Sequence, residues 1–124
     1  MSHKIIENIN LIEKDIRLKN EKVNIIAVSK TFSIENIKPL IDHGHIHFGE
    51  NKVQEAMQKW SDIKKISNNL KLHMIGKLQT NKVKYVIELF DYIHSVDNYK
   101  LAKKISEEEK KIGKKLKHFI QVNI

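Results

Sequence analysis

Two kinds of apolar pattern alternate along the chain. In one, apolar residues recur at spacings of three and four, which is typical of helices that bury one face. In the other, short runs rich in β-branched residues are typical of strands. The first pattern predicts helices over residues 3–20, 34–41, 52–67, 81–90 and 97–112. The second predicts strands over residues 24–30, 45–48, 70–75, 91–96 and 119–124.

The order of these elements indicates the fold class. A leading helix in residues 1–20 precedes four strand–helix units and a final strand in residues 24–124. Strands that alternate with helices in this way form a parallel α/β sheet through right-handed crossovers. The length of 124 residues suits a single domain. An open doubly wound sheet and part of a (β/α) barrel both fit this order.

The positions of polar residues favour the barrel. The turn after the first predicted strand, residues 29–33, contains no glycine, whereas a dinucleotide-binding sheet has a glycine-rich turn there. In a barrel, the chemistry lies at the C-terminal ends of the strands. Polar residues gather at such ends in this chain: Ser29, Lys30, Glu50, Asn51, His73, Ser95, Asp97, Gln121 and Asn123.

The first predicted strand is distinguished by the lysine that ends it. Four apolar residues, 25–28, lead through Ser29 into Lys30. We expect this strand to be covered on both faces, where an ammonium group needs a partner or a function. Burial favours the neutral amine, which is the nucleophile that forms a Schiff base with an aldehyde. The alternative is a lysine at the mouth of the strand with its ammonium in water, as in most exposed lysines.

Composition narrows the function classes. The sequence has no cysteine and no apolar run of about 18 residues, and its first residues mix charges with isoleucines, unlike a signal peptide. We therefore expect a cytoplasmic protein without membrane segments or disulfides. The formal net charge is +8, but the lysines are scattered and Arg17 is the only arginine. Because arginine is the preferred reader of guanine and phosphate, a basic nucleic-acid-binding module is the weaker alternative.

A metal site is not expected. His43, His45 and His47 alternate, and His45 and His47 would share one face of the second predicted strand. No third ligand accompanies them, whereas protein zinc sites use three or four.

Three motifs, each at a predicted strand end, are similar to those of a known family. They are AVSKT at residues 27–31, FGEN at 48–51 and HMIGKLQTNK at 73–82, and the closing QVNI at 121–124 also fits. In this order and at these separations they resemble the pyridoxal-phosphate homeostasis proteins, the family of bacterial YggS and the eukaryotic PROSC-type proteins. The resemblance extends from about residue 22 onward, and the leading helix fits it too.

The resemblance implies a fold, a cofactor and a site. The fold is a (β/α)8 TIM barrel like the N-terminal domain of alanine racemase. The cofactor is pyridoxal 5′-phosphate, held as a Schiff base by the lysine that matches Lys30, with Asn51 and His73 near it. The function is homeostasis of this cofactor, vitamin B6, without established turnover, and PLP-dependent apoenzymes are candidate partners. A racemase-like enzyme is the alternative, but it needs a second acid–base group that the sequence does not visibly supply.

Two of these residues have structural alternatives. Asparagine is a common turn former and helix cap, so Asn51 fits either role as well as a cofactor contact. His73 also fits a hydrogen-bonded core histidine.

The length departs from the family pattern. A complete barrel has eight units and about 250 residues, whereas this chain has the leading helix and about four and a half βα units. The resemblance places the phosphate-binding serine, glycine and arginine residues in the later part of the barrel. We expect a fragment of a longer product; the alternative is a natural half-barrel that self-associates to cover its open sheet edges.

Overall fold

The computed structural model describes residues 2–19 and 22–124, in which five strands form one parallel sheet in the order β1-β2-β3-β4-β5. The strands are β1 (Ala27–Val28), β2 (His47–Glu50), β3 (Lys71–Met74), β4 (Tyr92–Val96) and β5 (Lys117–Ile120). The helices are α1 (Ser2–Lys19), α2 (Ile34–Asp42), α3 (Val53–Ile66), the 3₁₀ turn η1 (Thr80–Lys82), α4 (Val83–Leu89) and α5 (Tyr99–Ile112). The predicted α/β class with a parallel sheet is confirmed. None of these helices combines the length and apolar character needed to cross a bilayer.

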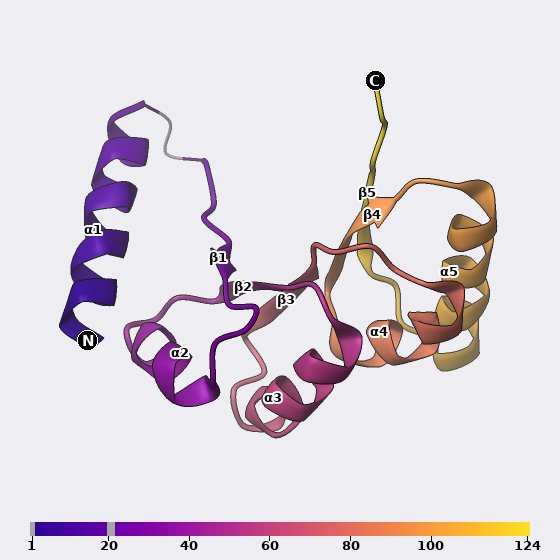
Figure 1. The fold of residues 1–124 in the computed structure, drawn as a ribbon, viewed down its shortest axis with the longest axis horizontal. Coiled ribbons are helices and arrows are strands. Elements are labelled where there is room, and N and C mark those ends of the chain that lie inside the picture. The colour runs from indigo at the N-terminus through magenta and orange to yellow at the C-terminus, as the bar shows by residue number, and fades with distance from the viewer. Residues whose placement is uncertain (1, 20–21) are drawn as a thin grey trace.

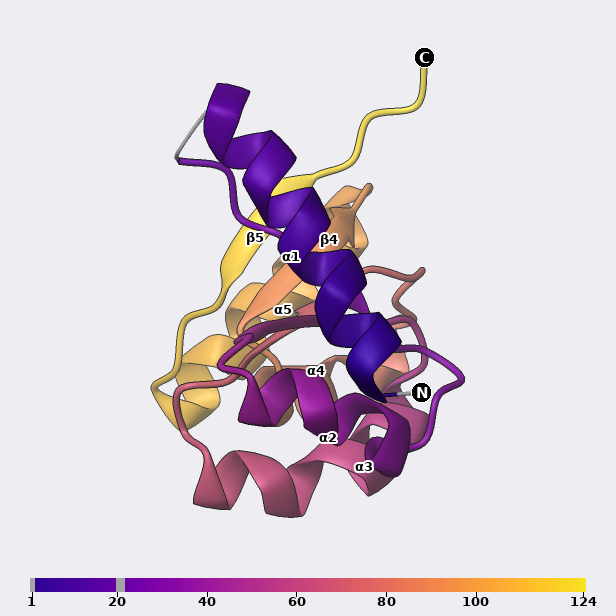
Figure 2. The ribbon, with the colours of Figure 1, turned by 90° about the vertical axis from the view of Figure 1, so that its left-hand side faces the viewer.

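The helices are distributed unevenly about the sheet. Helices α2 to α5 lie along one side of it, and α1 stands at the edge beside β1 and α2 (Figures 1 and 2). We call the side toward α2–α5 the helix face and the opposite side the open face.

The helix face carries the hydrophobic core. Phe48, Leu72, Met74 and Ile93 point from the strands toward the helices, and each is at most 1% exposed. Trp60 of α3 packs on Phe48 with 5.0 Å between the ring centroids. Burying a large apolar side chain stabilises a fold by about 1.5–3 kcal/mol. This face therefore holds the sheet to its helices.

The open face is read from the strand register, because side chains alternate between the two faces of a sheet. Val28 pairs with Gly49, Gly49 with His73, His73 with Tyr92 and Tyr92 with Lys117, so these five residues form one row across the open face. Val28 is 52% exposed. The expectation that the first strand is covered on both faces is therefore wrong for this side of it.

The predicted strands differ in extent from the observed ones, most at the first, second and last; the second, expected over residues 45–48, is shifted to His47–Glu50. The strand expected over residues 24–30 is reduced to Ala27–Val28, because β1 is an edge strand that pairs only with β2. The strand expected over residues 119–124 begins earlier, at Lys117, and ends at Ile120. Its pairing with β4 fixes this register, and beyond it only the Gln121 N–H continues the ladder, to the Val96 carbonyl.

The turns that follow β2 and β3 touch at Gly76. A Cβ atom added to Gly76 would lie 2.6 Å from both the Cβ and the carbonyl oxygen of Asn51. Real Cβ atoms do not approach backbone this closely, so the contact requires glycine. The absence of a side chain at Gly76 therefore sets the position of Asn51.

We expect Gly76→Ala to lower the free energy of unfolding by about 3 kcal/mol, because the new methyl group overlaps the Asn51 backbone. Gly113→Ala is the matched control: its φ is +67° but nothing lies within 4 Å of the added methyl group, so only the left-handed backbone costs energy, about 1 kcal/mol. Urea denaturation of both variants measures the difference. Equal losses would show that the Gly76–Asn51 contact relaxes freely.

Candidate functional site

The predicted site residues lie toward the C-terminal ends of β1, β2 and β3. Lys30 follows β1 by two residues and is exposed, and strand alternation places it on the open face with Val28. Asn51 follows β2 and is half-buried. When the register of Val28 with Gly49 is extended by two residues, past the last paired residues, Lys30 aligns with Asn51.

His73 lies deeper in the sheet than these two. It shares the row of Val28 and Gly49, two strands away from β1. With strands about 4.8 Å apart and about 3.3 Å per residue, its Cα is about 12 Å from that of Lys30. The register therefore aligns Lys30 with Asn51 and sets His73 further along the sheet.

The polar ends of the Lys30 and Asn51 side chains are available to bind a ligand. Within residues 2–19 and 22–124, neither the Lys30 ammonium nor the Asn51 amide has a hydrogen bond or ion pair. The residue at the cap of α3 is Lys52, so Asn51 does not serve as its helix cap.

A buried ion pair lies directly behind Lys30, on the helix face. Glu50, at the end of β2, is fully buried, and its carboxylate accepts hydrogen bonds from Lys59 Nζ at 3.0 Å and from Trp60 Nε1 at 3.2 Å. The Ser29 hydroxyl also donates to Glu50. Glu55 completes the group, 3.5 Å from Lys59 Nζ. We call Ser29, Glu50, Glu55, Lys59 and Trp60 the Glu50 network.

The Glu50 network joins three elements at one point. A buried carboxylate is tolerated only when it is paired and its remaining lone pairs are satisfied. Here the partners come from the end of β1 and from α3, one and two turns into that helix. The charge of Glu50 therefore holds the end of β1 against β2 and α3.

Three histidines form a chain across the open face. His47 Nδ1 lies 2.9 Å from His73 Nε2, and His73 Nδ1 lies 2.8 Å from His94 Nε2. The His73 ring stacks on Tyr92 at 4.1 Å, and the His94 ring on Phe119 at 4.5 Å. Since a neutral imidazole carries one donor and one acceptor, His73 can satisfy both neighbours while uncharged.

Burial favours the uncharged form of all three. Burial, with smaller contributions from the neighbouring His94 and His47, lowers the pKa of His73 from 6.5 to about 4. Burial is also the main cause that lowers the pKa of His47 and of His94. His73 is thus a buried, hydrogen-bonded histidine, the structural alternative that its sequence context left open.

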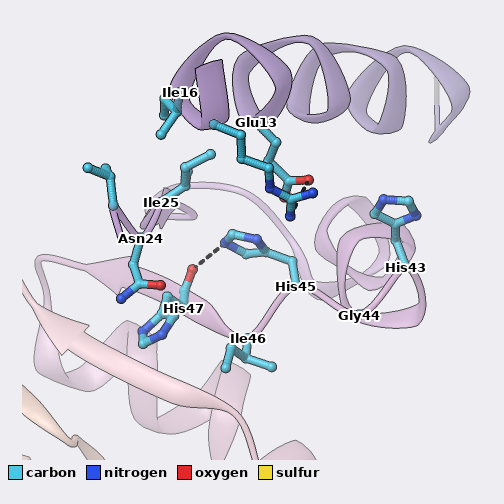
Figure 3. Close-up of a pocket in the computed structure, with 11 residues that line it drawn as sticks. Glu13, Ile16, Asn24, Ile25, His43, Gly44, His45, Ile46 and His47 are labelled. Atoms are coloured by element: carbon cyan, nitrogen blue, oxygen red, sulfur yellow. Dashed lines mark hydrogen bonds and ion pairs between the residues drawn. The ribbon is translucent and has the colours of Figure 1, made fainter. Parts of the chain in front are cut away.

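A cavity of about 340 Å³ lies at the other end of the sheet. Its lining comes from α1 and from the segments that precede or begin β1 and β2, as Figure 3 shows. There, His45 Nε2 bonds the His47 carbonyl at 2.8 Å rather than pairing with the His47 ring. No group of three or more potential metal ligands occurs in the described part of the chain. The cavity is remote from Lys30.

Sequence reasoning missed the Glu50 network and the histidine chain. The sequence indicates Glu50 only as one of the polar residues at strand ends, although the spacing of Glu50, Glu55 and Lys59 runs into a predicted helix. The signal for the histidines was one histidine in each of three successive predicted strands, His47, His73 and His94. Their alignment depends on the strand register.

Fold and site define a parallel α/β protein with a lysine and an amide at neighbouring strand ends and a chain of imidazoles deeper in the same sheet. The chain is 39% identical to a pyridoxal phosphate homeostasis protein of Buchnera aphidicola over 94% of its length, and 36% identical to that of Pasteurella multocida over 95%. It is also similar to the solved structure of PipY from Synechococcus elongatus with PLP bound, with a TM-score of 0.80 and 35% identity over 90% of this chain. No family model matches the chain.

These comparisons confirm the resemblance to the pyridoxal-phosphate homeostasis proteins. They also set its extent: the chain spans about half the length of the curated relatives it matches, 54% and 51% of the first two, and 52% of PipY.

Lys59→Met should lower the free energy of unfolding by about 3–5 kcal/mol at neutral pH, since it leaves the Glu50 carboxylate buried without its cation. Arg17→Met is the control. Arg17 pairs with Glu13 at 3.9 Å and is 73% exposed, so its loss should stay within about 0.5 kcal/mol. Thermal and urea denaturation measure both. A loss in Lys59→Met as small as that control would show that Glu50 does not depend on Lys59.

Stability should fall as the pH drops from 6.5 to about 4, the ordinary and the folded pKa of His73. In this window the unfolded chain binds a proton at His73 and the folded chain does not, so protons favour unfolding. His73→Phe keeps the ring that stacks on Tyr92 and should show a smaller loss. Urea denaturation at about pH 7.5 and about pH 4.5 gives the difference for parent and variant; identical losses would contradict the assignment.

Proposed function

We propose that this chain binds pyridoxal 5′-phosphate through Lys30 and takes part in homeostasis of that cofactor. The observation that carries the proposal is the similarity to PipY, whose structure has PLP bound, together with a free, exposed ammonium at the C-terminal end of β1. The relatives named pyridoxal phosphate homeostasis proteins support the same role. PLP-dependent apoenzymes are the proposed recipients.

The proposed linkage is a Schiff base. The neutral Lys30 amine adds to the aldehyde carbon, a C=N bond forms, and the carbonyl oxygen leaves as water with the protons of the amine. Asn51 aligns with Lys30 in the extended register and its amide is free, so on this proposal Asn51 donates to the ring substituents. His73 contributes to the wall of the site further along the face.

The charge of the open face suits an anionic cofactor. Lys71 pairs in register with His47, and Lys117 with Tyr92, so both belong to the same face as Lys30. The Lys117 ammonium lies 5.6 Å from the centre of the Tyr92 ring, which agrees with this placement. Three cations on one face raise the local concentration of a phosphate ester.

We further propose that the sheet is part of a (β/α)8 barrel of the alanine racemase type, with the open face as its inner wall. The sheet has two edges, β1 and β5, and the chain spans about half of its relatives. A closed barrel would pair both edges and cover the open face. On this proposal, the phosphate group is held by strands beyond these 124 residues.

The test is to trap the adduct by borohydride reduction in the presence of pyridoxal 5′-phosphate and to map it by peptide mass spectrometry. We expect Lys30 to be modified before the other lysines, and Lys30→Ala to lose that product. Lys38→Ala, which removes an exposed lysine on the helix side in α2, is the control and should retain it.

The affinity of these 124 residues alone should be at least about a hundredfold weaker than that of PipY, because the barrel proposal assigns the phosphate contacts and the cover over Lys30 to other strands. Absorbance titration measures this. Uniform modification of all lysines, or a Lys30→Ala variant that titrates like the parent, would contradict the proposed site.

A further inference from the structure

The main chain on both sides of Lys30 is bound by side chains of α3. The Ser29 carbonyl accepts a hydrogen bond from Lys59 Nζ at 2.8 Å, and the Thr31 N–H donates to Glu55 Oε1, also at 2.8 Å. Glu55 and Lys59 are one helical turn apart and pair with each other. One ion pair on α3 therefore holds both neighbours of the lysine.

The bound segment has an unusual conformation. Thr31 has φ of +67°, and it is the one non-glycine residue with positive φ in the described ranges 2–19 and 22–124. A β-branched residue rarely adopts this region, and such strain persists only where the surroundings determine it. The Thr31 N–H is also the main cause that lowers the pKa of Glu55, which fits a charge-assisted bond.

The side chain of Lys30 contrasts with this backbone. Its two neighbours are fixed by side chains from another element, while its own ammonium has no partner within the described residues. A segment that is held rigidly and leaves one reactive group free is what a covalent attachment site requires.

We propose that Glu55 and Lys59 are positioning residues for Lys30: by binding Thr31 and Ser29 they fix the direction in which the lysine leaves the sheet. The inference rests on the proposed function of Lys30. Glu55 is the better residue to test, because Lys59 also neutralises the buried Glu50, and its loss threatens the fold.

The experiment compares Glu55→Ala, Glu55→Gln and Glu13→Ala. Glutamine keeps an oxygen that can accept a hydrogen bond from the Thr31 N–H, so Glu55→Gln should restore most of the selectivity for Lys30. Glu13 is the matched control: like Glu55 it pairs with a cation four residues later, and the two side chains are 29% and 32% exposed. Only Glu55 touches the segment around Lys30.

Two readouts are followed: hydrogen exchange of the Thr31 amide, and modification of Lys30 relative to Lys38 by pyridoxal 5′-phosphate with borohydride. In Glu55→Ala we expect exchange to rise about tenfold, the effect of losing a charge-assisted bond. We expect selectivity for Lys30 to fall several-fold, about three- to tenfold. Glu13→Ala should match the parent in both, and Glu55→Gln, which keeps the acceptor without its charge, should lie nearer the parent than Glu55→Ala does.

The outcomes separate the two proposals. If the parent shows no preference for Lys30, the proposed function fails and this inference with it. If the parent prefers Lys30 and Glu55→Ala does so equally, the positioning role is overturned while the proposed function stands. A fall in selectivity that Glu55→Gln does not restore also overturns it, because the acceptor for Thr31 is then not what matters.

Discussion

The structure depends most on the buried pair between Glu50 and Lys59. A carboxylate with no exposed surface is stable only if cations and donors replace the water it has lost. Glu50 belongs to β2 and its partners come from Ser29, just after β1, and from α3, so these elements can take only the arrangement in which all the partners reach one carboxylate. Apolar packing on the same face is less directional, because one hydrophobic contact can replace another. The pair thus specifies the end of the sheet where the chemistry is placed.

Two successive residues after β1 have different roles: Ser29 stabilises the fold, and Lys30 is the proposed reactive group. Ser29 points to the helix face and donates to Glu50, whereas Lys30 follows it onto the open face. Along β2, likewise, Glu50 faces α3, whereas the position of the next residue, Asn51, is fixed by its contact with Gly76. Polar residues at strand ends are therefore of two kinds. Those toward the helices fix the ends of the strands, and those toward the open face are left available.

The positions of most helices and strands were predictable from the local sequence pattern. Which side chains lie on each face of the sheet, and which face is uncovered, was not. Helical spacing located α3 and α5 to within two residues, and the strand-end motifs located Lys30, Asn51 and His73. Local pattern could not show that β1 is an edge strand, because the isoleucines and valine of residues 25–28 look the same with one neighbour or two. Nor could it place Glu50 inward or align three histidines, since both depend on register between strands that are distant in sequence.

The exposure of the Lys30 amine links the proposed cofactor to the proposed barrel. Schiff-base formation uses the neutral amine of a lysine, because the nitrogen lone pair attacks the aldehyde carbon. Burial favours the neutral form of a lysine amine, so a cover over the open face would raise the reactivity of Lys30 further. Closing a barrel over that face would cover Lys30 and would also pair the β1 and β5 edges. The same closure that completes the sheet would thus activate the amine, so the cofactor site and the closed barrel impose a single structural requirement.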